Sequence, residues 1–249
     1  KEATILVNEL IKAENFFKTS EVIIFPSFSL LSHVYSKIHS SNIKLGAQDC
    51  SFFDHGAFTG QVSAEMIIDA GCEYQGYAAD ITRTFPVSGV FSSEQRAIYD
   101  LVLKAQRAAI AKVRPGNTWN QPHDATVRVI TRGLIKLGLL KGVERELTKA
   151  EAYMDFYMHR AGHWLGLDVH DVGEYRVDGR WRQLEPGMVL TIEPGIYIAA
   201  DNTKVPKRWR GIGVRIEDDV VVTETGCDVL TEDVPKHADE IEALMKRAS

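Results

Sequence analysis

Acidic side chains interrupt otherwise apolar, strand-like runs at four places in this chain, and this pattern restricts how the chain can fold. A carboxylate inside a buried strand is unfavourable unless it is paired or bound to a cation. One such residue is typical of a salt bridge, whereas four, together with a histidine-rich segment, indicate a metal site. The four are Asp69 after residues 66–68, Asp80 before Ile81, Glu193 after residues 189–192, and Glu217 after Ile216.

The first two of these carboxylates belong to a predicted hairpin. Residues 66–73 and 77–83 predict two antiparallel strands around the turn Tyr74-Gln75-Gly76. A turn centred between Tyr74 and Gln75 would place Asp69 directly opposite Asp80, where cross-strand neighbours are roughly 4.5–5.5 Å apart. Two carboxylates at that separation repel each other, and one or two divalent cations would remove the repulsion.

Three histidines lie close together further along the chain. His159, His163 and His170 fall within 12 residues, and imidazoles so placed suit metal ligation or proton transfer. A mixed set of carboxylate and imidazole ligands suits Mn, Co, Fe or Zn. Strand periodicity also places Arg215 on the same face as Glu217. Taken singly, each residue has another interpretation: a salt bridge or helix cap for the acids, a buried core residue for His163, and a structural ion pair for Arg215.

Five segments in this order resemble the bacterial aminopeptidase P family, from residue 69 to about residue 249. They are residues 69–74, 80–86, 163–166, 191–195 and 215–219. The resemblance implies the pita-bread fold that this family shares with methionine aminopeptidase and prolidase. It implies two bound divalent metal ions, Mn by preference, with Asp80 and Glu217 bridging them. The implied metal ligands are Asp69, Asp80, His163, Glu193 and Glu217.

The same resemblance implies a reaction and a substrate. A metal-bridging hydroxide would attack the scissile carbonyl, and Glu193 would also carry the proton. His159 and His170 would line the substrate site, and Arg215 would be a partner of the carboxylates. The substrate would be a peptide with proline at its second position.

The family resemblance is not found upstream of about residue 66. Here the pattern predicts helices over 3–16 and 29–40, strands over 21–28 and 42–47, and a loop over 51–60, which together indicate a parallel α/β unit. Residues 22–28, 45–49 and 56–66 resemble strands, a loop and a helix of triosephosphate isomerase. That family's catalytic lysine, histidine and glutamate have no counterparts, so this segment is not expected to supply isomerase chemistry.

These two resemblances predict a division into residues 1–66 and residues 67–249, and a chimeric chain. The lobe that precedes the first metal aspartate in the pita-bread family is expected to be absent, together with its substrate-site histidine, which His55 does not match. An unmatched surface between the segments would favour association into a homo-oligomer. The fold class is therefore predicted as α/β or α+β, with a pita-bread-like C-terminal half preceded by a triosephosphate-isomerase-like βαβ fragment.

Local signals locate the remaining elements. Ser92 and Gln95 have the spacing of a capping box, which predicts a helix from Ser92 to about Val113. Further predicted elements are helices over 123–137 and 238–247 and strands over 188–193, 196–199 and 214–222.

Composition excludes some classes of function. The net charge of −5 leaves no basic surface for nucleic acid, and no apolar run reaches the roughly 18 residues that span a membrane. The three cysteines, Cys50, Cys72 and Cys227, are few and widely spaced, which predicts free thiols and a cytoplasmic protein. The leading hypothesis is a metallo-aminopeptidase that cleaves X-Pro bonds. The alternatives are an inactive metal- or peptide-binding scaffold and a triosephosphate isomerase.

Overall fold

The structure is a computed structural model that describes residues 7–8, 11–12, 23–24, 37–38, 41, 44–45 and 65–248. Contacts between residues divide the chain into two compact units, Lys1–Asp54 and His55–Ser249. No helix in the described part of the chain is long and apolar enough to cross a membrane.

The first unit contains a pair of parallel strands. Strand β1 (Ile23–Ile24) pairs with β2 (Lys44–Leu45), with Ile23 beside Lys44. Residues 7–8, 11–12 and 37–38 are helical. Where residues are described, these elements agree with the predicted helices and strands of a parallel α/β unit. The predicted loop over 51–60 lies outside the described residues.

The described part of the second unit begins with the predicted hairpin, but the predicted register is wrong. Strand β3 (Glu65–Ala70) pairs antiparallel with β6 (Ile81–Pro86), and Asp69 lies opposite Thr82 rather than Asp80. Two short strands, β4 (Glu73–Tyr74) and β5 (Tyr77–Ala78), continue the hairpin to its tip.

Turn chemistry explains this difference in register. Gln75 and Gly76 occupy the two central positions of the turn and both have positive φ, at 53° and 85°. A two-residue turn of this kind matches the twist of the strands and favours glycine at its second position. The turn is therefore centred one residue later than predicted, which moves the partner of Asp69 by two residues. Because side chains alternate with period two, Asp69 and Asp80 still belong to the same face.

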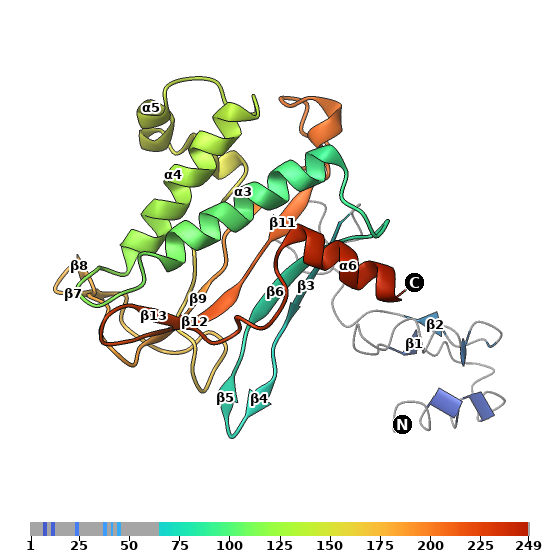
Figure 1. Ribbon diagram of the computed structural model, residues 1–249, viewed down its shortest axis with the longest axis horizontal. Helices are drawn as coiled ribbons and strands as arrows, with labels where there is room; N and C mark the ends of the chain where they lie inside the picture. Colours follow the sequence, from blue (N-terminus) through green and yellow to red (C-terminus); the bar gives the residue numbers. More distant parts are fainter. Residues whose placement is uncertain are drawn as a thin grey trace. The chain divides into compact units, whose positions relative to one another are not determined.

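A long helix and the closing helix pack on the strands of this unit, and a second long helix packs on the first (Figure 1). Helix α3 (Ser93–Ile110) begins at the predicted capping box, with both reciprocal hydrogen bonds between Ser92 and Gln95 present. Helix α4 (Asn120–Lys136) begins three residues earlier than predicted, and α6 spans Ala238–Ala248. Helix α3 contacts α4, β9, β10 and β11, and α6 contacts β6.

The remaining strands form small antiparallel groups. Strand β12 (Asp218–Val222) lies between β9 (Val189–Ile192) and β13 (Cys227–Val229), and β10 (Gly195–Tyr197) pairs with β11 (Gly213–Arg215). The single strand predicted over 214–222 is wrong, since it is broken at Ile216 and Glu217. Elements that the pattern did not predict are helix α5 (Glu144–Lys149), the 3-10 turns η3 (Ala152–Asp155) and η4 (Lys207–Trp209), and the β7 (Arg176–Val177) and β8 (Arg180–Trp181) hairpin.

Two clusters of buried apolar side chains support this arrangement. The larger cluster joins α3 and α4 to β10 and β11, with Ile98, Ile130 and Val214 fully buried. The smaller one includes Trp164 and Leu190 and lies around β9 and β12. Both clusters therefore border the strands that carry the acidic residues, and they fix the positions of those strands.

Candidate metal centre

Three of the predicted ligands form a compact group. One ligand atom each from Asp80, His163 and Glu217 lies within 4.8 Å of the others. Asp80 immediately precedes β6, and Glu217 occupies the break between β11 and β12. Residue exposure is only 8% for Asp80 and 1% for Glu217, so two buried carboxylates meet an imidazole at this point.

The other two predicted ligands border this group. An oxygen of Glu193 lies 3.8 Å from Nε2 of His163, and the other oxygen lies 4.0 Å from Nε of Arg215. Asp69 receives a hydrogen bond of 2.6 Å from Arg215. Burial raises the pKa of the Asp69 carboxyl, and the nearby charge of Asp80 raises it further. The fold therefore brings all five predicted ligands to one place.

Burial makes the free cluster electrostatically unfavourable. Burial raises the pKa of Glu217 to about 9, that of Glu193 to about 7 and that of Asp69 to about 6. Burial opposes the charged forms of Asp80 and His163 as well, but the hydrogen bond between them lowers the pKa of Asp80 and raises that of His163. Buried carboxylates with raised pKa values are stabilised in their ionised form by a nearby cation.

The orientation of His163 also fits a metal. Its Nδ1 lies 3.0 Å from the carbonyl oxygen of Trp164, so Nδ1–H donates to that oxygen. Nε2 is then the nitrogen that faces Asp80, at 3.4 Å. Metal-binding histidines generally donate their other N–H in this way, which fixes the ring and its tautomer. The donor set of four carboxylates and one imidazole thus fits a divalent cation.

Arg215 organises one side of the cluster. Besides its bond to Asp69, its guanidinium donates to Oγ1 of Thr82 at 3.2 Å and to the hydroxyl of Tyr197 at 3.2 Å. Thr82 in turn donates to Glu217 at 2.5 Å. The arginine therefore holds two acidic residues, Asp69 directly and Glu217 through the threonine hydroxyl.

The two histidines predicted to line a substrate site occupy different environments. Nδ1–H of His159 donates to the carbonyl of Arg160 at 2.8 Å, and Nε2 accepts a hydrogen bond of 2.9 Å from Tyr197. Burial lowers the pKa of His159 to about 4, so this ring is neutral at pH 7. The ring of His170 is exposed and meets that of His163 edge-on at 4.3 Å. Both histidines therefore border the cluster, one half-buried and one open to solvent.

Three residues at the site were not predicted as functional. Thr82 shares the strand face of Asp80, and that alternation is a signal that could have identified it. Tyr197, at the end of β10, contacts His159 and Arg215 through its hydroxyl. Asp219 is 3% exposed and accepts a hydrogen bond of 3.1 Å from the backbone N–H of Asp80. Its position in an acidic pair after Glu217 gave no indication of which acid would face the cluster.

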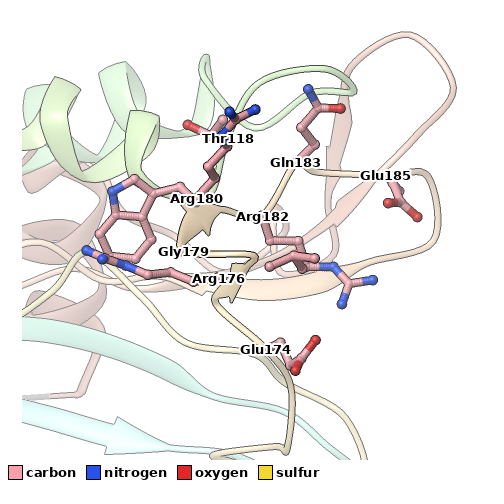
Figure 2. Close-up of a pocket in the computed structure, with 10 residues that line it drawn as sticks. Thr118, Glu174, Arg176, Gly179, Arg180, Arg182, Gln183 and Glu185 are labelled. Carbon is pink, nitrogen blue, oxygen red and sulfur yellow. The ribbon is translucent and has the colours of Figure 1, made fainter.

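A separate cavity of about 840 Å³ lies beside the β7–β8 hairpin (Figure 2). Charged residues in its wall are Arg176, Arg180, Arg182, Glu174 and Glu185. The guanidinium of Arg176 stacks over the ring of Trp181 at 4.0 Å. None of the five predicted metal ligands lines this cavity, so the chemistry predicted from the acidic residues belongs to the carboxylate cluster and not to this opening.

Comparison with known proteins agrees with the geometry of the cluster. The profile of metallopeptidase family M24 matches residues 16–224. The chain belongs to metallopeptidase family M24. The Xaa-Pro aminopeptidase of Escherichia coli K12 is 56% identical over 183 residues, which are 74% of this chain and 41% of that protein. The corresponding enzyme of Haemophilus influenzae is 57% identical over 180 residues, 72% of this chain and 41% of its own length.

Solved M24 structures show the same fold. The aminopeptidase PepP of Pseudomonas aeruginosa matches with a TM-score of 0.75 and 50% identity, covering 97% of this chain and 57% of that one. A zinc-substituted E. coli aminopeptidase P in complex with product matches with a TM-score of 0.71 and 55% identity, covering 74% of this chain and 42% of that one. The pita-bread M24 fold predicted for the C-terminal half is thus confirmed.

The M24 comparisons also bear on the N-terminal segment. The chain spans about two fifths of the length of the E. coli and H. influenzae relatives. The family profile begins at residue 16, well upstream of residue 66. The comparisons therefore do not support the resemblance of residues 1–66 to triosephosphate isomerase, nor the hypothesis of a chimeric chain.

Proposed function

We propose that this chain is the metal-binding catalytic segment of a metallo-aminopeptidase that releases an N-terminal residue ahead of proline. The observation that carries the proposal is the meeting of five predicted ligands, Asp69, Asp80, His163, Glu193 and Glu217, at one largely buried place. The family membership supports a metallopeptidase, and the names of the E. coli and H. influenzae relatives support the preference for proline.

The five side chains would hold two divalent cations. Mn is the proposed metal, and the zinc-substituted E. coli relative supports a site that accepts more than one divalent metal. When bound, such cations supply a nucleophile at neutral pH and polarise the scissile carbonyl.

The residues of the chain have distinct proposed roles around that chemistry. Glu193 is the proposed general base that accepts and returns the proton, and its carboxylate lies 3.8 Å from His163 within the cluster. His159 stays neutral, since burial lowers its pKa to about 4. It contacts the substrate through Nε2, the nitrogen that accepts a hydrogen bond from Tyr197 in this structure. His170 lies at the exposed edge of the cluster and contacts the peptide there. Arg215 holds Asp69 in place.

Mn(II) titration of the chelator-treated protein by calorimetry tests the proposal, followed by hydrolysis of an X-Pro peptide and its X-Ala counterpart. We expect two bound ions per chain in the wild type, and loss of binding in Glu193→Ala and His163→Ala. His237→Ala is the matched control, because that histidine is exposed and contacts Arg107 instead of a carboxylate of the cluster. Absence of Mn(II) binding by the wild type would refute the proposal. Binding without hydrolysis would favour the non-catalytic alternative.

The remaining predictions extend this proposal. Three inferences from the sequence stay predictions: a division of the chain near residue 66, a homo-oligomeric assembly and a cytoplasmic location. Gel filtration with light scattering measures the assembly, and limited proteolysis measures the division.

A further inference from the structure

Two segments that carry proposed ligands run antiparallel beside each other and are linked at every second residue. They are residues 80–84 of the first hairpin and residues 215–219 around the break between β11 and β12. The three linked pairs are Thr84 with Arg215, Thr82 with Glu217, and Asp80 with Asp219. This ladder sets the separation of Asp80 from Glu217, since each segment supplies one of these two carboxylates.

The first two links involve the backbone of the second segment. The N–H of Arg215 donates to Oγ1 of Thr84 at 3.1 Å, and that hydroxyl donates to the carbonyl of Arg215 at 2.8 Å. The N–H of Glu217 donates to the carbonyl of Thr82 at 3.0 Å. The register of the two segments is thus fixed up to Glu217 by local hydrogen bonds.

The third link is made by a side chain. Oδ2 of Asp219 accepts the backbone N–H of Asp80 at 3.1 Å, while Oδ1 has no hydrogen-bond partner among the described residues. Asp219 is 3% exposed. Burying a carboxylate with an unpaired oxygen opposes folding, and such a group in a native structure calls for another explanation. The stability of the fold alone therefore does not account for an acid at this position.

Asp219 also lies next to the segment that holds the imidazole. Across β12 and β9 it is the direct partner of Thr191. The backbone N–H of Thr191 donates to the carbonyl of His163 at 3.0 Å, and the N–H of His163 donates to Oγ1 of Thr191 at 3.2 Å. Asp219 thus connects the segment of Asp80 with the segment of His163.

We infer that Asp219 is a positioning residue of the metal centre. By holding the amide of Asp80, it maintains the spacing of Asp80 from Glu217 and His163 that a bound cation requires. This inference rests on the proposed function, because it takes the cluster to be a site for divalent cations.

The test compares Asp219→Ala and Asp219→Asn with the wild type, using the whole chain. Mn(II) affinity is measured by calorimetry, and thermal unfolding is measured on the metal-free proteins. We expect Asp219→Ala to lose about 10- to 100-fold in affinity, the usual effect of removing a partner of a metal ligand. Asp219→Asn keeps an oxygen that can accept the amide of Asp80, and we expect it to regain most of that loss.

Other outcomes overturn the inference. It fails if Asp219→Ala binds Mn(II) as tightly as the wild type, or if Asn restores nothing, since a purely structural acid would behave in these ways. If Asp219→Ala does not fold, Asp219→Asn decides alone, because its affinity must stay close to that of the wild type. If the wild type itself binds no Mn(II), the proposed function fails and the inference fails with it, whereas hydrogen exchange of the Asp80 amide in the metal-free proteins shows separately whether Asp219 holds that amide. That amide must exchange faster in Asp219→Ala than in the wild type.

Discussion

Replacing Glu193 by glutamine should stabilise the metal-free protein at alkaline pH while weakening metal binding. Burial raises the pKa of Glu193 from 4.5 to about 7, and its side chain is 20% exposed. One pKa unit corresponds to about 1.4 kcal/mol, so ionised Glu193 reduces the free energy of unfolding by about 3 kcal/mol. Glutamine has nearly the same shape and does not ionise, so the variant avoids this loss.

The effect has a defined dependence on pH. Glu193 is the case of a carboxyl group whose pKa is raised on folding, so its contribution to stability is complete below pH 4.5 and is lost as the pH rises through about 7. The advantage of Glu193→Gln should therefore be about 1 kcal/mol at pH 5 and about 3 kcal/mol at pH 8. For a protein of this size, the larger value raises Tm by roughly 6 to 12 °C.

Calorimetric melting with a chelator at pH 5 and pH 8 measures this difference. Exposed Glu232, replaced by glutamine, is the matched control and should show no such change. Added Mn(II) should raise Tm of the wild type more than that of Glu193→Gln, because a ligand stabilises only the state that binds it. Equal melting of the variant and the wild type at pH 8, or an equal gain at both pH values, would refute the reasoning about burial.

Three further substitutions, each measured by urea unfolding, test the helix cap, the hairpin and the buried ion pair near the site. Ser92→Ala removes the acceptor of the capping box of α3 and should reduce the free energy of unfolding by about 1 kcal/mol; an unchanged midpoint would contradict this. Gly71→Ala should prevent cooperative folding of the hairpin, because its Cβ would lie 1.6 Å from the carbonyl oxygen of Ala79; a native-like midpoint would show that the backbones can separate. Arg83→Met leaves fully buried Asp218 without its guanidinium partner and should reduce stability by about 3 kcal/mol; a loss below 1 kcal/mol would mean that the remaining contacts of Asp218 suffice.

The acids of the site could be found from the sequence because each one conflicts with its surroundings. A carboxylate after a run of apolar β-formers is unfavourable wherever the strand is buried, so Asp69 and Glu193 attract attention without any knowledge of the fold. The register of the hairpin was predicted wrongly, although Gly76 is a signal for its turn. The shared face of Asp69 and Asp80 was still predicted, since an error of two residues leaves strand alternation unchanged.

Contacts between distant segments could not be derived from local patterns. Residues 214–222 have the composition of one continuous strand, yet the N–H of Glu217 bonds to the carbonyl of Thr82 and the strand breaks there. The role of Asp219 depends on the same meeting of two segments. Local periodicity describes how one segment presents its faces, and it contains no information about which distant backbone group will lie opposite.

The cluster joins parts of the chain that are synthesised far apart in time. Thr82 and Glu217 are 135 residues apart, and a cation shared by Asp80 and Glu217 would close a loop of similar length. A cross-link of that size reduces the entropy of the unfolded chain by an amount equivalent to about 5 kcal/mol. At about 5–20 residues per second, Asp80 precedes Glu217 by roughly 7 to 27 s during translation. Arg215 is synthesised only two residues before Glu217. Until this late stage, the earlier carboxylates therefore have no arginine beside them, and the set of proposed metal ligands is incomplete.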